Sequence, residues 1–432
     1  MNNSSRNDKS TAKSIDVRHL EDEAYNFFDV KNDNIAGKAP KKRTVGFTES
    51  SYLDFAGFKR RQPRKSKRLT FGTVIRRILV SILAFLLFVL VSVYAVLFSI
   101  AKGPSETVRN TLVLSAKQAS ATKWVPSLFL DSKTIDKILA DSKKVTTDSI
   151  SLDSYSGTPD GDDVTSEDEW ADAVDGMLYR EIKGATYKAY MLIVKDPSRV
   201  FVGTSSDFKS GKQGSTIFDA AKKYDAVAAI NGGEFSDPGG VGTGDNPIGL
   251  TYSLGECVWS GDSKRTFIGF DENNRLVVSE GMTKKRAEEL NIRDAVSFQT
   301  GNVLISSDGD NVTLYYANGN TGTAQRTAIG QRRDGAVILL VTDGRSASSL
   351  GATHNDIIDI MVEYGAINAA MLDGGSSSMI YYENYYEKYG KDYEMLDQYQ
   401  KRGLINKYKA FTTPRQMPTF FMVSKNEGGV AE

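Results

Sequence analysis

A carboxylate, two glycines and three hydroxyls follow one another in the last quarter of this 432-residue chain, at Asp373-Gly374-Gly375-Ser376-Ser377-Ser378. Apolar runs lie on both sides of them, so the chain turns here between two buried segments. Glycines let the backbone approach a ligand closely, and backbone N–H groups beside small hydroxyls bind oxyanions or sugar hydroxyls. The competing interpretation is a simple turn in which Asp373 caps its own backbone.

Two other apolar segments also end in an acid or an amide beside glycine. Residues 226–230 lead into Asn231-Gly232-Gly233-Glu234, and residues 336–342 lead into Asp343-Gly344-Arg345. Strand ends followed by glycine turns are common positions for binding sites. Together with Arg326 and Arg415 at the edges of predicted strands, the pattern predicts that these ends meet in one cleft.

Composition limits the chemistry that such a cleft can use. The 54 basic residues balance the 54 acidic ones, so no overall charge favours nucleic acid as a partner. Cys257 is the single cysteine, which excludes an internal disulfide framework and a cysteine zinc cage. With only His19 and His354, a catalytic triad or a His-rich metal site is not expected. Carboxylates, arginines, hydroxyls and backbone groups remain.

Residues 78–100 contain no charged side chain. At 1.5 Å per residue, a helix of this length crosses the hydrocarbon core of a membrane. Basic residues crowd between 59 and 77, whereas Lys102 and Arg109 are the only ones close behind the stretch. The positive-inside rule therefore predicts a single-pass protein of the cell membrane, with its N-terminus in the cytoplasm and its C-terminal domain outside. The stretch is too long and too far from Met1 for a cleaved secretory signal.

The chain divides into four predicted parts. They are a disordered cytoplasmic tail at 1–77, a transmembrane anchor at 78–100, a helical stalk with an acidic linker at 101–178, and a folded domain at 179–425. Within the domain, β-prone segments alternate with helices predicted at 217–224, 283–290 and 354–364. This order predicts an α+β fold with a mixed sheet. Residues 385–408 are expected to form an exposed loop, and 411–423 a closing strand.

Six short stretches resemble, in consistent order, the phosphodiester glycosidase family, over roughly residues 180–425. They are AINGGEF at 229–235, NPIG at 246–249, RTAIG at 326–330, VTDGR at 341–345, LDGGSS at 372–377 and PRQ at 414–416. Many members carry two aromatic residues after Asn-Gly-Gly, where this chain has Glu234 and Phe235. Glu234 therefore has two interpretations, a local acid or a loop residue.

The resemblance implies an extracytoplasmic glycosidase that hydrolyses a sugar-1-phosphodiester, N-acetylglucosamine-like, in cell-envelope or exopolysaccharide metabolism. The expected partners are a sugar phosphate or an envelope polysaccharide, and the membrane. A phosphate leaves as a stabilised anion, so one carboxylate and a cationic clamp suffice where ordinary glycosidases need two carboxyl groups. Asp373 is expected at the oxocarbenium-like centre, with Asp343 or Glu234 as the base for water.

Arginine presents a planar fork that matches phosphate. Arg326 and Arg345, with Arg415 behind them, are therefore expected to hold phosphate or to position the carboxylates. The alternative for Arg326 and Arg345 is a buried ion pair between strands. The residues expected to contact sugar or phosphate oxygens are Asn231, Gly232, Gly233, Thr327, Gly374, Gly375, Ser376, Ser377 and Ser378. The same oxygens can hold Ca²⁺ or Mg²⁺, although no spacing here requires an ion.

Two other activities fit these residues. One is a non-catalytic glycan-binding or assembly factor in exopolysaccharide biosynthesis, built on the same fold. The other is a phosphodiesterase that cleaves the P–O bond instead of the C–O bond.

Overall fold

The computed structural model describes residues 70–117, 122–142, 145–155, 167–205, 208, 213–238, 244, 246–318, 321–344, 349–408 and 413–425. By compactness the chain forms two units, Met1–Val74 and Ile75–Glu432. Nearly all of the described residues belong to the second unit. Most of the predicted cytoplasmic tail lies outside the described residues, and so does Arg345.

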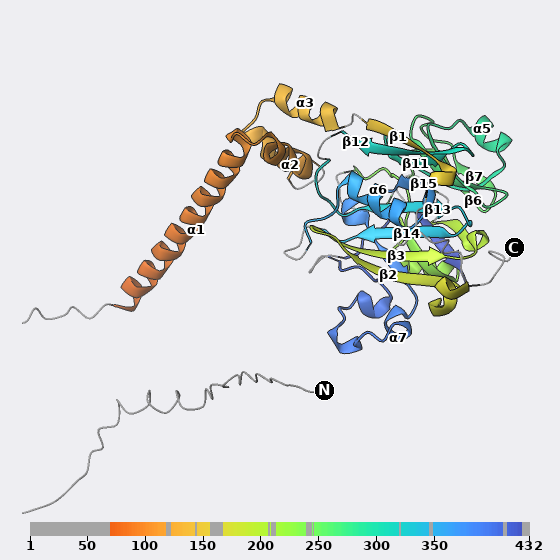
Figure 1. The fold of residues 1–432 in the computed structure, drawn as a ribbon. Helices are drawn as coiled ribbons and strands as arrows, with labels where there is room; N and C mark the ends of the chain where they lie inside the picture. The colour runs from red at the N-terminus through yellow and green to blue at the C-terminus, as the bar shows by residue number, and fades with distance from the viewer. Residues whose placement is uncertain are drawn as a thin grey trace, which may run out of the picture. The chain divides into compact units, whose positions relative to one another are not determined.

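One long apolar helix, α1 (Phe71–Lys102), precedes the β-rich part of the chain (Figure 1). It is long and apolar enough to cross a membrane, and no residue of its apolar window is buried. The side chains of Leu83 and Phe88 are 68% and 69% exposed. A core helix of a soluble protein buries side chains of this kind, so the surface of α1 requires lipid or a protein partner.

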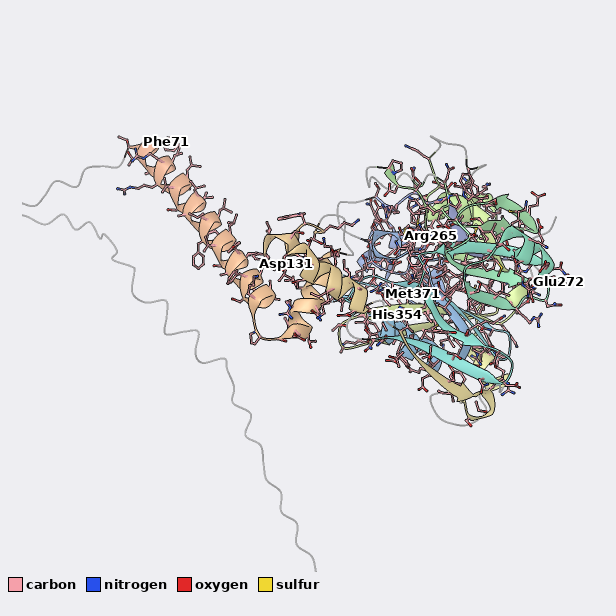
Figure 2. The ribbon with its side chains drawn as sticks, turned by 90° about the horizontal axis from the view of Figure 1, so that it is seen from above. Phe71, Asp131, Arg265, Glu272, His354 and Met371 are labelled. Carbon is pink, nitrogen blue, oxygen red and sulfur yellow. The ribbon has the colours of Figure 1, made fainter. Side chains whose placement is uncertain are left out.

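Two helices follow, at the positions where the sequence predicts a helical stalk. They are α2 (Glu106–Lys117) and α3 (Ser132–Ser142), and we call residues 106–142 the helical hairpin. Leu114 of α2 packs in a small apolar cluster with Ile135 and Ile138 of α3. Asp131, labelled in Figure 2, accepts a hydrogen bond from the backbone N–H of Thr134 at 2.9 Å and so caps the start of α3.

The largest sheet has eight strands in the order β1-β12-β11-β15-β13-β14-β3-β2. Each of its neighbouring pairs is antiparallel. The strands are β1 (Val145–Ser151), β2 (Met177–Lys183), β3 (Lys188–Val194), β11 (Val303–Ser307), β12 (Asn311–Ala317), β13 (Thr327–Arg332), β14 (Val337–Thr342) and β15 (Ala366–Met371). The predicted stalk and linker region therefore supplies an edge strand, β1, to the same sheet that holds β14 and β15.

Two smaller antiparallel sheets complete the β-structure. A four-stranded sheet runs β16-β5-β17-β4, and a five-stranded sheet runs β7-β6-β10-β8-β9. The former contains β4 (Val200–Thr204), β5 (Ala226–Asn231), β16 (Ile380–Tyr382) and β17 (Thr419–Ser424). The latter contains β6 (Thr251–Ser253), β7 (Glu256–Trp259), β8 (Thr266–Asp271), β9 (Leu276–Glu280) and β10 (Ile292–Phe298). The predicted α+β fold is confirmed.

The core lies between these sheets and the helices that cover them. Every residue of β5, β14 and β17 is buried, which explains their uninterrupted apolar sequences. Helix α6 (His354–Glu363) packs across β11, β12 and β15, and α4 (Ile217–Lys223) packs on β5 and β17. A short helix, α5 (Lys284–Glu289), packs on β10. The three helices predicted in this domain are confirmed.

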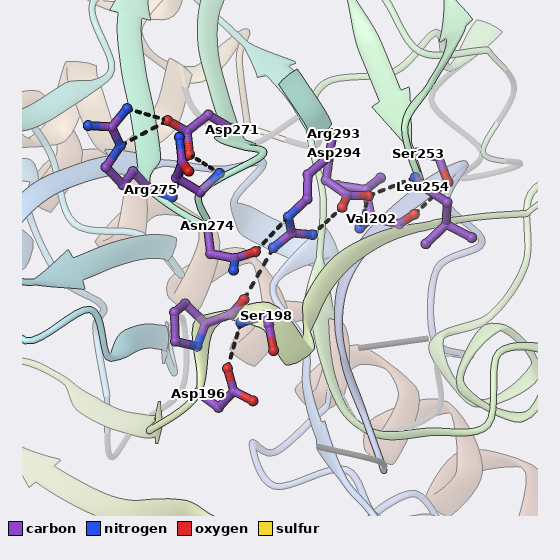
Figure 3. A network of polar contacts seen from close by, with 12 residues as sticks. Asp196, Ser198, Val202, Ser253, Leu254, Asp271, Asn274, Arg275, Arg293 and Asp294 are labelled. Atoms are coloured by element: carbon purple, nitrogen blue, oxygen red, sulfur yellow. Dashed lines mark hydrogen bonds and ion pairs between the residues drawn. The ribbon is translucent and has the colours of Figure 1, made fainter. Parts of the chain in front are cut away.

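A buried acid joins the five-stranded sheet to the four-stranded sheet (Figure 3). Oδ1 of Asp294, on β10, accepts hydrogen bonds from the backbone N–H groups of Val202 at 2.8 Å and Leu254 at 3.0 Å. Arg293 pairs with the same carboxylate and donates to Oδ1 of Asn274 at 3.0 Å. Burial raises the pKa of Asp294, and Arg293 opposes that rise. This network fixes β10, which in turn supports the candidate site.

Two expectations for the C-terminal part are wrong. Residues 385–408 are not a fully exposed loop, because Tyr385, Leu404 and Ile405 are buried. They contain α7 (Tyr385–Lys388), and tyrosine rings pack against each other there, as Tyr386 does on Tyr393 at 5.0 Å between centroids. The closing strand β17 begins at Thr419 and not near 411.

Candidate active site

Asp373 lies where the eight-stranded sheet meets the four-stranded sheet. The ladder of β15 continues one residue past its end, because the N–H of Leu372 donates to Thr327 O at 2.8 Å. The next N–H, that of Asp373, crosses to the other sheet and donates to Gly232 O at 3.2 Å, just after β5. Two sheets thus fix the backbone of Asp373, while the glycines that follow let the chain turn away.

Asn231 holds this junction from below. Its side chain is fully buried, and its Nδ2 donates to the backbone carbonyl of Asp373 at 2.6 Å. Its Oδ1 accepts from Thr327 Oγ1 at 2.8 Å and from the N–H of Met379 at 3.1 Å. The structure therefore places Asn231 and Thr327 beneath Asp373, where they position it, rather than at a surface that a sugar contacts.

Arg415 and Ser377 are next to Asp373. Nη1 of Arg415 donates to Ser377 Oγ at 3.2 Å, and Nη2 pairs with the carboxylate of Asp237. The guanidinium carbon lies 5.4 Å from the centre of the Phe235 ring, which supports it from one face. Arg415 comes from the segment before β17, so this part of the site depends on the last strand of the chain.

Glu234 forms the other acidic part of the site. Its backbone is fixed by β10, since its N–H donates to Ser297 O at 2.8 Å. Its carboxylate pairs with Nη1 of Arg265 at 3.0 Å, and Arg265 also pairs with Asp262 at 3.3 Å. Figure 2 shows Arg265 and Met371, the last residue of β15, within the β-rich body. The structure thus favours an acid at Glu234 over a plain loop residue.

The two acids influence each other's charge. Burial raises the pKa of Asp373 to about 6; Ser377 and Arg415 oppose this rise, and the negative charge of Glu234 adds to it. Burial also raises the pKa of Glu234, against the attraction of Arg265. Two neighbouring carboxyl groups with raised pKa values, in contact with arginines, are typical of a functional site.

A cavity of about 670 Å³ opens at Asp373. Residues that line it include Gln325, Arg326, His354, Gly374 and Gly375. This volume lies in the range of pockets that hold small molecules. Burial lowers the pKa of His354 to about 4, so its ring is neutral at pH 7. The glycine turn predicted to bind a ligand thus borders a space large enough for one.

Arg326 lines the cavity, but its guanidinium also supports the fold. Nε donates to Ala352 O at 3.2 Å, and Nη2 donates to Gly322 O at 3.1 Å. These bonds hold the loop before β13 against the loop before α6. They are bonds to backbone carbonyls, which differ from the interstrand ion pair that the sequence left open.

Asp343 lies at the same edge of the sheet as Asp373, but its surroundings differ. Strands β14 and β15 flank β13, and both are antiparallel to it, so their C-terminal ends lie at one edge. The carboxylate of Asp343 is 7% exposed, and its Oδ2 accepts from the hydroxyl of Tyr190 at 2.8 Å. Burial raises its pKa, and the Tyr190 bond opposes the rise. It does not line the described cavity, so Glu234 has the better position for a base.

The glycines have different roles. A Cβ on Gly232 would lie 2.4 Å from Thr419 Oγ1, and one on Gly233 would lie 2.3 Å from Ser297 O. These two allow the three sheets to pack closely. Gly375 has φ +65°, with no atom within 4 Å of an added Cβ, and it borders the cavity. Ser376 is exposed beside it, whereas Ser377 and Ser378 are buried.

Sequence reasoning missed several residues of this site. Asp237, Arg265 and Gln299 are among them, and Gln299 both lines the cavity and bonds the Glu234 carboxylate. Asp237 follows Glu234 by three positions, and Arg265 follows Asp262 by three, but neither spacing indicates a ligand site by itself. Among the described residues, no group of three or more His, Cys, Asp or Glu side chains is placed to hold a metal ion.

Comparisons with known proteins give a family for this domain. Residues 224–424 match the family model for phosphodiester glycosidases. The SPbeta prophage-derived protein YomE of Bacillus subtilis (strain 168) is 29% identical over 200 residues, which covers 44% of this chain. The chain spans only 28% of that relative's length.

Solved structures are similar at a lower level. The catalytic domain of zebrafish N-acetylglucosamine-1-phosphodiester α-N-acetylglucosaminidase, auto-inhibited by its pro-peptide, is 17% identical with a TM-score of 0.44. That match covers 65% of this chain and 88% of the zebrafish one. A hypothetical protein from Synechocystis is 12% identical with a TM-score of 0.36, over 57% of this chain and 61% of its own. Scores this low carry no argument about the site.

The family match and the geometry concern the same residues. Asn231, Glu234, Arg326, Asp373 and Arg415 all lie within the matched range. The domain formed by residues 224–424 belongs to the phosphodiester glycosidase family.

Proposed function

We propose that this chain hydrolyses a sugar-1-phosphodiester at the anomeric carbon of the sugar. The observation that carries the proposal is the position of Asp373, a carboxyl group fixed by two sheets at the border of a cavity of about 670 Å³. Arg415 and Glu234 influence its charge from either side. This arrangement lies inside the segment that matches the phosphodiester glycosidase family.

The reaction breaks the C1–O bond to phosphate and forms a C1–O bond to water. Asp373 is the carboxylate that stabilises positive charge at C1 as the phosphate departs. Glu234 accepts the proton of the attacking water, since Asp343 is bonded to Tyr190 and lies outside the cavity lining. Arg415 and Arg326 supply positive charge for the phosphate, which leaves as an anion and needs no proton.

Membrane attachment is the second part of the proposal. Helix α1 exposes apolar side chains along its length, and basic residues crowd on its N-terminal side. Both features support a single-pass protein whose glycosidase domain lies outside the cell membrane. We assign the substrate to cell-envelope or exopolysaccharide metabolism, with N-acetylglucosamine as the first sugar to test.

The test uses the full chain in detergent and the methyl phosphodiester of N-acetylglucosamine-1-phosphate. The wild type is expected to release free sugar, and Asp373→Asn to lower the rate by a factor of about 10³ or more, as loss of a reacting carboxylate does. Asp136→Asn, an exposed acid of α3, is the matched control and should keep the full rate. In ¹⁸O-labelled water the label should appear on the sugar.

Two results would contradict the proposal. Label on the phosphate means P–O cleavage by a phosphodiesterase. If no sugar is released, while wild type and Asp373→Asn bind envelope polysaccharide equally, the protein is a glycan-binding or assembly factor instead.

A further inference from the structure

The cavity at Asp373 is not built by the glycosidase domain alone. Leu114 and Lys117 of α2, Lys123 after it, and Leu139 of α3 line the same space as Asp373. These four residues lie in the helical hairpin, outside the segment 224–424 that matches the family. The hairpin therefore adds a wall that the family's own domain does not contain.

Contacts at both ends hold this wall against the domain. The N–H of Thr323, on the loop before β13, donates to Ser115 Oγ of α2 at 3.2 Å. Beside it, Gly322 has φ +75°, and a Cβ there would lie 2.8 Å from the backbone nitrogen of Ser115. After α3, strand β1 pairs with β12 from Val145 onward. The hairpin thus lies between two fixed points, one of which adjoins the loop that leads to Arg326.

The hairpin changes the charge of the cavity. Among the described lining residues, three carry positive charge, namely Lys117, Lys123 and Arg326, and only Asp373 is acidic. Arg326 is already bonded to two backbone carbonyls. In the described part of the chain neither lysine forms an ion pair, and Lys123 is exposed at the mouth of the cavity. Two flexible ammonium groups therefore face an acid across a space that can hold a small molecule.

We propose that Lys117 and Lys123 form the subsite for the phosphate and the leaving alcohol of a glycosyl phosphodiester. This inference rests on the proposed function, in which Asp373 acts at the sugar side of the same bond. The lysines then bind the anionic side, and the hairpin completes the site instead of only connecting it to α1. An ammonium group is a compact charge on a long flexible stem, which suits a diester whose alcohol varies in size.

The chain also limits where this subsite can be. Only Gly103, Pro104 and Ser105 separate the end of α1 from α2, whose length is 12 residues. Three extended residues and 12 helical ones reach no further than about 30 Å. Lys117 therefore remains within that distance of the apolar helix. Phosphodiesters carried by membrane lipids are within its reach, and soluble diesters share the same chemistry.

The experiment measures binding and turnover separately, with the full chain in detergent-free vesicles of neutral lipid. Binding of the methyl phosphodiester of N-acetylglucosamine-1-phosphate is measured in the Asp373→Asn background, where it is not consumed. Lys117→Gln with Lys123→Gln is expected to weaken binding about tenfold, as loss of two exposed charged contacts does. The same pair in the wild-type background should raise KM by a similar factor and leave kcat within about twofold.

Two matched controls keep the test specific. Lys133→Gln with Lys137→Gln removes two exposed lysines of α3 that do not line the cavity, and it should change neither binding nor KM. Lys117→Arg with Lys123→Arg retains the charge and should recover most of the affinity. Unchanged melting temperatures show that the folded state is intact. A second arm replaces the methyl diester by a diester of a long-chain alcohol held in the vesicles; a larger KM change there indicates a membrane-borne substrate, and an equal change indicates a soluble one.

The inference is overturned if the glutamine pair binds the diester as the wild type does, or if the diester does not bind at all. It is also overturned if the glutamine pair turns over faster at saturation, since the hairpin then blocks the site. Failure of the proposed function looks different: the diester binds in a lysine-dependent manner, but no sugar is released.

Discussion

The side-chain amide of Asn231 donates to the backbone carbonyl of Asp373 at 2.6 Å, across 142 residues of sequence. Asn231 ends β5 of the four-stranded sheet, and Asp373 follows β15 of the eight-stranded sheet. The bond therefore connects two sheets at the point where the candidate carboxylate emerges. Because Asn231 is fully buried, its polar atoms have no access to solvent if their partners are lost.

Removing this amide should both destabilise the fold and displace Asp373. For Asn231→Ala we expect a loss of about 2–3 kcal/mol in the free energy of unfolding, since two buried donors lose their acceptor. We also expect a fall in kcat greater than the change in KM. Urea denaturation and steady-state kinetics check the two effects. Thr327→Val removes only one of these donors and should cost less; equal stability of Asn231→Ala and wild type would contradict the positioning role.

The pH dependence of activity should have an acidic limb near pH 6. The pKa of Asp373 is raised to about 6, and its ionised form is the one proposed to act, so the rate should rise with pH through that value. Glu234→Gln removes a negative neighbour and should move the limb to lower pH. Arg415→Gln removes a positive neighbour and should move it to higher pH. Profiles of kcat/KM against pH measure these shifts; movement in the same direction for both variants would refute the assignment of the limb to Asp373.

The same pKa predicts how stability depends on pH. Since the pKa of Asp373 is higher in the folded chain than its ordinary value of 3.8, the folded state binds this proton more tightly. The resulting stabilisation is complete below about pH 3.8 and is lost as the pH rises through about 6. Asp373→Asn should therefore be more stable than wild type at pH 8, by about 1–2 kcal/mol after allowance for solvent screening. At pH 4 the two should unfold at nearly the same denaturant concentration, and a constant difference between them at both pH values would contradict the linkage.

The Asp294 network should matter for folding and not for substrate choice. Asp294→Asn leaves Arg293 without its anion and weakens two backbone bonds, so we expect a loss of about 3–5 kcal/mol in the free energy of unfolding. The relative rates on different diesters should remain those of the wild type, because the network lies behind β10 and not in the cavity lining. Thermal unfolding and a substrate panel measure both. Asp271→Asn, a partly exposed pair with Arg275, is the milder control.

Much of the fold could be predicted from local sequence. The apolar run at 336–342 could only form a buried strand, and the spacing of Ile357, Ile358 and Met361 in 354–364 matched a helix with one buried face. The uncharged stretch at 78–100 indicated α1 by length alone. Strands such as β1 and β7 were missed because their sequences are polar, and they exist only because a neighbouring strand offers backbone partners.

The sequence by itself determined which residue types were available and that three glycine turns carry Asn231, Asp343 and Asp373. Only the tertiary structure decided their positions: Asn231 beneath the site, Asp343 bonded to Tyr190, and Asp373 at the cavity. The pairing of β5 and β15 with different sheets, and the docking of α2 on the loop at Thr323, depend on contacts between distant segments. Residue spacing along a chain has no information about such contacts, because they are selected by the burial of whole strands and helices against one another.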